Sequence, residues 1–285
     1  MKKTLFTCLC LSMLSLNLSA QNESGSFDKK YRFGLRVAAQ PSWFSSGDKN
    51  NIPNGSIFGF GFGLNMEYRF SEIAALLTGI GGDFEGGKYK FKSDTANSYQ
   101  VSYWMDESGA LVAPKAGKKP DNTVYVLSAR TVKTTFATIP VILKMSTREY
   151  NGFKYFGMFG GEIGIRLKST ATDTYDKINK YSNDLTFKTI SAVQTTESGV
   201  DIGSDGSLIP IRLGLNVGFG TEYRIAGSTS LFMSVNFFKS GTNLMKKESD
   251  YMYYRTDMGT GGESYKMVKQ NLRQTAVRIN IGIMF

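Results

Sequence analysis

Apolar residues alternate with small or polar ones in several long stretches of this chain. In the last stretch, "TAVRINIGIMF" at residues 275–285, every second residue from Val277 to Phe285 is apolar. Arg278 and Asn280 lie between them. Successive side chains of a β-strand point to opposite faces, so this period of two predicts a strand with one apolar and one polar face.

The same alternation recurs along the chain and predicts eight strands. They cover about residues 30–40, 58–69, 73–92, 132–146, 153–168, 208–224, 230–240 and 268–285. The connections alternate between short turns and long loops, and the long loops cover about residues 41–57, 93–131, 169–207 and 241–267. Membrane barrels have short periplasmic turns and long extracellular loops. The sequence therefore predicts an all-β fold, an eight-stranded antiparallel transmembrane β-barrel.

Some segments fit this scheme less simply. The second long loop contains "SYQVSYWM" and "TVYVLSA", at 98–105 and 123–129, which predict either a hairpin above the membrane or an added strand pair. The added pair would make ten strands, and we favour eight. Pro140 cannot donate to a strand ladder and predicts a bulge or a strand end, and Gly81–Gly82 predicts a bulge or a bend.

The N-terminus reads as a secretory signal peptide. Lys2 and Lys3 precede an apolar run, and Ala20 offers a small residue for cleavage. We expect residues 1–20 to be the signal peptide and residues 21–285 the outer-membrane barrel domain. Both cysteines lie within the signal segment, so no disulfide is expected in the exported protein. No later apolar stretch is long enough for a membrane-spanning helix.

Charge and composition restrict the chemistry. The chain has a net charge of +10 and contains no histidine, which removes the commonest general base and metal ligand. No Gly-x-Ser-x-Gly motif is present. We therefore expect no enzyme activity, no cofactor and no metal. An exported basic protein is expected to meet outer-membrane lipid and lipopolysaccharide rather than nucleic acid.

Charged residues on the polar faces of the strands predict a network inside the barrel. Eight strands enclose a space that side chains just fill. Mixed charges buried there should pair, which predicts a structural plug, and the excess of arginine favours a narrow anion pathway as the alternative. The predicted network contains Arg32, Arg36, Glu67, Arg69, Lys144, Glu162, Arg166, Arg212, Glu222 and Arg278. The glycines of "GFGFG" at 59–63 are interpreted as room inside a narrow barrel.

The loops contain aromatic and basic residues that could bind a glycan, a lipid head group or a protein. The candidates are Tyr103, Trp104, Lys118, Lys119, Tyr253, Tyr254 and Arg255. The alternative interpretation is an aromatic interface girdle with solvated lysines. "DIGSDGS" at 201–207 resembles a calcium loop but has Arg212 where an EF-hand needs an acid, so a turn is expected.

The chain resembles the PorT family of small outer-membrane barrels, which is found mainly in Bacteroidota. The resemblance rests on the order of several motifs and covers the whole exported chain. The motifs are "FATIPVILKM" (136–145), "FGMFGGEIGIRL" (156–167), "GLNVGFGTEY" (214–223), "GTNL" (241–244) and the terminal strand ending in Phe285. The resemblance implies a β-barrel in the outer membrane of a Gram-negative bacterium and a role in secretion or envelope biogenesis.

These observations predict a monomeric, non-enzymatic barrel with a plugged lumen that binds a partner or assists assembly through its extracellular loops. Ile281, Ile283 and Phe285 are expected to form a C-terminal signal for the barrel-assembly machinery. An envelope or secretion protein is a further expected partner. The alternatives are a passive narrow channel for small anionic solutes and a soluble lipocalin-like barrel that binds lipid.

Overall fold

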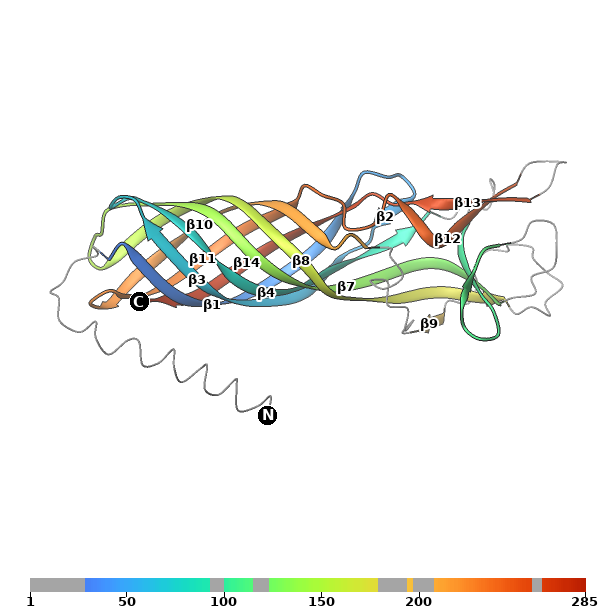
Figure 1. Cartoon of the computed structure of the whole chain (residues 1–285), viewed down its shortest axis with the longest axis horizontal. Helices are drawn as coiled ribbons and strands as arrows, with labels where there is room; N and C mark the ends of the chain where they lie inside the picture. Colours follow the sequence, from blue (N-terminus) through green and yellow to red (C-terminus); the bar gives the residue numbers. More distant parts are fainter. Residues whose placement is uncertain (1–28, 93–99, 115–122, 179–193, 197–207, 258–262) are drawn as a thin grey trace, which may run out of the picture.

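The computed structural model describes residues 29–92, 100–114, 123–178, 194–196, 208–257 and 263–285. The predicted signal peptide lies outside these residues. Eight antiparallel strands form a closed barrel (Figure 1). They are β1 (Tyr31–Ser46), β3 (Ser56–Arg69), β4 (Ala74–Phe91), β7 (Thr123–Ser146), β8 (Phe153–Ile178), β10 (Ile211–Ala226), β11 (Thr229–Ser240) and β14 (Leu272–Met284). The predicted fold class is confirmed.

The barrel closes by pairing its first and last strands. Leu35 of β1 lies opposite Ile283 of β14. Phe285 continues the ladder, since its backbone N–H donates to the carbonyl of Phe33 at 2.8 Å and its carbonyl accepts from the Phe33 N–H at 3.1 Å. The closed ladder leaves no unpaired strand edge within the barrel, as a hydrocarbon environment requires.

The outward face of the barrel is apolar and exposed. On β3, alternate residues from Phe58 to Leu64 point outward, and on β10 those from Ile211 to Phe219 do so. Arg32, Glu67 and other charged residues are buried on the inward face. A lipocalin-like barrel would have the reverse arrangement, so that alternative is wrong. The described residues include no helix long and apolar enough to cross a membrane.

The strand ladders show no bulge at Pro140 or at Gly81–Gly82. The β4–β7 register is the same on both sides of Pro140, although the ladder lacks the pairs at Ile139 and Pro140 because proline has no N–H. Pro140 lies inside β7, and the nearest register shift is with β8, between Thr135 and Phe136. The β3–β4 register also runs without a shift through Gly81–Gly82. Neither Pro140 nor Gly81–Gly82 therefore forms the bulge that was one of the two predicted alternatives at each position.

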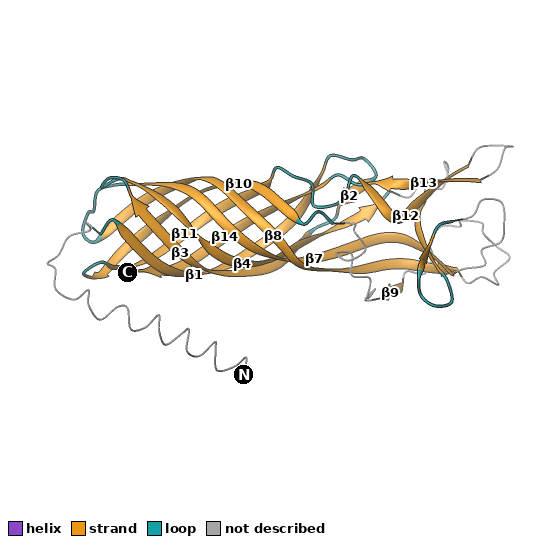
Figure 2. Ribbon diagram, viewed as in Figure 1, coloured by secondary structure: helices purple, strands orange, loops and turns teal. Residues whose placement is uncertain are grey.

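Several strands continue well beyond the predicted ends. β7 begins at Thr123 and β8 ends at Ile178, and both extend past the barrel on the side opposite the C-terminus (Figures 1 and 2). The shorter strands are β2 (Asn51–Pro53), β5 (Gln100–Met105), β6 (Leu111–Val112), β9 (Gln194–Thr196), β12 (Glu248–Asp257) and β13 (Glu263–Lys269). They lie on this side too. The short turns and the C-terminus lie at the opposite, periplasmic end.

The extensions form an extracellular sheet in the order β13–β12–β5–β7–β8–β9. β4 pairs with β7 from Met145 back to Ala129. From Leu127 to Thr123, nearer the start of β7, β5 takes the place of β4 beside it. The described part of the first segment, β5, and residues 123–127 of the second are thus antiparallel neighbours above the barrel. They add no strands to the closed barrel, so the ten-stranded alternative is wrong.

Candidate functional site

Charged side chains form two separate networks in the lumen. The first, here the periplasmic network, comprises Arg32, Glu67, Arg69, Lys144 and Glu222. Lys144 Nζ lies 2.7 Å from Glu67 Oε2 and 2.8 Å from Glu222 Oε2. Arg32 Nη1 lies 2.6 Å from Glu222 Oε1, and Arg69 Nε lies 2.9 Å from Glu67 Oε1. Four strands, β1, β3, β7 and β10, therefore contribute to one connected layer of ion pairs at the periplasmic end.

The second network lies further along the barrel and is here called the central network. Its members are Arg36, Asp83, Glu85, Glu162, Arg212 and Arg278. Glu162 Oε1 accepts from Arg212 and Arg278, each at 3.0 Å. Arg278 also donates to Glu85 at 2.6 Å. Arg212 pairs with Glu85 and stacks on Phe136 and Phe238, whose ring centres lie 4.0 and 4.4 Å from its guanidinium carbon.

Asp83 and Glu85 were missed by the sequence prediction. The glycines before them obscured the alternation, although Ile80 and Phe84 keep the outward parity of β4 and place both acids inward. With these two acids, three carboxylates face three guanidiniums in the central network. The arginine excess that favoured an anion pathway is therefore absent from this network.

Glycines give the long arginines room. A Cβ on Gly81 would lie 2.8 Å from Arg36 Nη2 and 2.9 Å from Thr138 Oγ1. A Cβ on Gly63 would lie 3.2 Å from Arg36 Nε. Both are close approaches that a side chain would disturb, which agrees with the interpretation of "GFGFG" as room inside the barrel.

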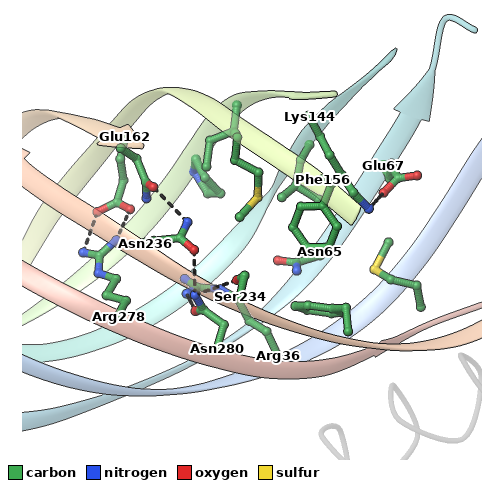
Figure 3. Close-up of a pocket in the computed structure, with 17 residues that line it drawn as sticks. Arg36, Asn65, Glu67, Lys144, Phe156, Glu162, Ser234, Asn236, Arg278 and Asn280 are labelled. Carbon is green, nitrogen blue, oxygen red and sulfur yellow. Dashed lines mark hydrogen bonds and ion pairs between the residues drawn. The ribbon is translucent and has the colours of Figure 1, made fainter. Parts of the chain in front are cut away.

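A cavity of about 40 Å³ lies between the two networks, which is room for roughly three water molecules. In Figure 3, Lys144 and Glu67 lie at one end of it and Glu162 and Arg278 at the other. Asparagines line the middle. Asn236 donates to Asn216 at 2.9 Å, and Asn280 donates to Asn236 at 3.2 Å. Apolar side chains, among them Ile142, Phe156 and Met158, also line the cavity, and an ion-pair network bounds it on each side.

Apolar and aromatic side chains lie above the central network. This group, here the extracellular core, includes Phe44, Tyr89, Val132, Tyr251 and Leu272, all almost fully buried. Within it, Arg130 donates to both carboxylate oxygens of Asp173, at 2.5 and 2.7 Å, and to the Tyr251 hydroxyl at 2.8 Å. The Arg130–Asp173 pair links β7 to β8, and the hydrogen bond from Arg130 to Tyr251 links β7 to β12. The sequence did not predict this pair, because both residues fall in segments that were predicted to be loops.

The loop candidates are placed differently from the prediction. Tyr103 and Trp104 are each 2% exposed, because β5 is packed on both faces. Tyr103 lies in the extracellular core, and Trp104 packs with Val124 and Val126 on the other face. Neither ring is available to a partner, so their assignment as direct binding residues is wrong.

The other predicted site residues remain untested. Tyr253 and Tyr254 are half-buried on β12, and the backbone of Arg255 pairs with Gln100 and Tyr265. Lys118, Lys119 and the segment 201–207 lie outside the described residues. Arg166 is partly buried on β8 opposite Phe136, and its N–H donates to the Pro210 carbonyl at 2.8 Å. Ile281 and Phe285 are exposed on the barrel's outer surface, and Ile283 is half-buried.

The extracellular core is predicted to lose stability at high pH. Burial raises the pKa of Tyr89 and of Tyr103 above the ordinary tyrosine value. The unfolded chain loses these protons near pH 10 while the folded core keeps them, so the core should lose stability as the pH rises above about 10. We expect tyrosinate absorbance from both residues to appear only on unfolding. Tyr89→Phe/Tyr103→Phe should flatten the alkaline slope, and an unchanged slope would contradict this assignment.

Sequence comparison places the chain in a family. A family model described as "Outer membrane protein beta-barrel domain" matches residues 19–210. The chain belongs to this family. Together with the apolar outer face of the closed barrel, this membership locates the protein in the outer membrane of a Gram-negative bacterium. No curated protein matches the sequence.

Solved structures provide distant likenesses. Neisserial surface protein A is 12% identical, with 92% of this chain and 100% of that chain covered and a TM-score of 0.35. OprG from Pseudomonas aeruginosa is 11% identical, with 90% and 97% covered and a TM-score of 0.37. The outer membrane protease OmpT from Escherichia coli is 9% identical, with 93% and 99% covered and a TM-score of 0.39. Similarity at such low sequence identity gives no information about activity.

Proposed function

We propose that this protein is a non-enzymatic barrel with a closed lumen, which binds a partner or assists envelope or secretion assembly through its extracellular sheet. The observation that carries the proposal is that three successive layers of side chains fill the lumen along its length. The periplasmic network, the central network and the extracellular core follow one another, and their charged side chains are almost all buried and paired. A filled lumen leaves the extracellular sheet as the principal working surface.

The PorT resemblance supports the envelope or secretion version of this role. A narrow channel for small solutes is the second candidate, because the small cavity between the two networks would form part of a path through the lumen. A channel would need both networks to open, which means separating several buried ion pairs. The closed barrel is therefore the stronger proposal.

Glu67→Gln tests the plug. Glu67 contacts Arg32, Arg69 and Lys144, so loss of its charge should lower the free energy of unfolding by about 2–3 kcal/mol. Conductance in planar bilayers should stay at the wild-type baseline, because the central network and the extracellular core still fill the lumen. Glu72→Gln, in an exposed turn at the same end, is the matched control and should change neither quantity.

The two candidates give opposite results in that experiment. A large rise in conductance at unchanged stability would favour a channel and overturn the plug. For the binding role, crosslinking in intact cells should capture a discrete envelope protein through the extracellular sheet. Capture through the periplasmic turns alone would overturn the assignment to the extracellular side.

A further inference from the structure

A row of three lysines lies on the outer surface of the barrel, just beyond its extracellular end. Lys88, Lys133 and Lys168 belong to the adjacent strands β4, β7 and β8 and are all exposed. Lys88 lies opposite Thr131, two residues from Lys133. Lys168 lies opposite Thr135, also two residues from Lys133. Successive lysines are thus diagonal neighbours, with Cα atoms about 7–8 Å apart.

The row lies at the edge of the apolar belt. Leu167, directly before Lys168, is 65% exposed on the outer surface. On β4, the outward positions below Lys88 are Gly86 and then Phe84, which stacks on Phe60 at a centroid distance of 4.3 Å. The lysine side chains therefore begin where the lipid-facing surface ends, at the level of the head groups of the outer leaflet.

The three positive charges have no counter-ion among the described residues. None of the three lysines forms an ion pair there, and no acid shares their face within two residues along these strands. Like charges on neighbouring strands repel one another, and an anion bound among the lysines would offset that repulsion. Thr131, Thr135 and Thr170 lie among the lysines on the same face and offer hydroxyl groups to the same anion.

The periplasmic end is different. Its charged residues include both signs, and Arg224 there pairs with Glu149. The unpaired cationic row occurs only on the side that faces the outer leaflet, within the described part of the barrel. The charge pattern therefore distinguishes the two leaflets.

We propose that Lys88, Lys133 and Lys168 form a binding site for the phosphate groups of lipid A in the outer leaflet. The ammonium groups pair with the phosphates, and the apolar surface beneath them contacts the acyl chains. The site lies outside the barrel, so it is independent of the closed lumen and of any protein partner of the extracellular sheet.

The test compares a triple variant with a matched one. Lys88→Gln/Lys133→Gln/Lys168→Gln removes the row, and Lys247→Gln/Lys266→Gln/Lys269→Gln removes three exposed lysines elsewhere on the extracellular side. Binding of bisphosphorylated lipid A to the detergent-purified proteins is measured by native mass spectrometry. The first variant should bind about tenfold more weakly than wild type, and the second within about twofold. Unchanged heat-modifiability on SDS gels checks that both variants fold.

Comparing several ligands shows whether the site recognises lipid A, another anionic lipid or free phosphate. Wild type should prefer bisphosphorylated over dephosphorylated lipid A, and Lys→Arg substitution of the row should preserve that preference. Equal loss of binding in the two triple variants would overturn the site. Equal binding of phosphatidylglycerol, or displacement of lipid A by millimolar inorganic phosphate, would show a general anion surface and would also overturn it.

Discussion

Glu162→Gln should lower the free energy of unfolding of the barrel by about 3–5 kcal/mol, because it removes the shared partner of two buried arginines. Glu162 accepts hydrogen bonds from Arg212 and Arg278 in the central network. Glutamine keeps the shape of the side chain but not its charge. Both guanidiniums would then depend on Glu85 and Asp83, and one positive charge would remain buried without compensation.

Urea unfolding in lipid vesicles measures the effect, with the fluorescence of the two tryptophans, Trp43 and Trp104, as the signal. Glu149→Gln is the control, because it makes the same substitution in the partly exposed Arg224–Glu149 pair. That change should cost under about 1 kcal/mol. If the two variants proved equally stable, the central network would contribute no more to stability than a surface pair, and the lumen would not be closed by a stable plug.

Sequence alternation predicted the barrel well within the membrane because lipid and lumen impose opposite demands on successive residues. Phe58, Ile211 and Ile281 point to lipid, while Arg32, Glu67 and Arg278 point inward. A period of two follows directly from that contrast. It allowed all eight strands of the barrel to be predicted, along with the residues that supply most of both lumen networks.

The same reasoning failed above the membrane. There both faces of a strand can be buried in protein, as Tyr103 and Trp104 show on β5. Val124 and Leu127 of β7 likewise pack on different faces of the sheet. Apolar residues are needed on both faces, so the sequence here does not alternate between apolar and polar residues. The long extensions of β7 and β8 were therefore assigned to loops. The partners of Arg130 could not be predicted for the same reason.

Arg130→Met is expected to loosen the extracellular sheet while leaving the barrel closed. Arg130 bridges Asp173 of β8 and Tyr251 of β12, and its loss leaves the Asp173 carboxylate buried without a counter-ion. Removing one partner of a buried pair typically costs about 3–5 kcal/mol. The cost should appear locally, as faster hydrogen exchange in β5 and β12 and a red-shifted emission from Trp104.

Two further variants separate charge from packing. Lys239→Met also replaces a basic residue by methionine, at an exposed position on β11 outside the extracellular sheet, and should leave exchange in β5 and β12 unaltered. Arg130→Met/Asp173→Leu removes both charges, and replacing a buried pair by apolar residues is often neutral or stabilising. The double variant should therefore recover most of the lost protection. If it stayed as loose as Arg130→Met, the contact of Arg130 with Tyr251, rather than its pairing with Asp173, would be what holds β12 against β7 and β8.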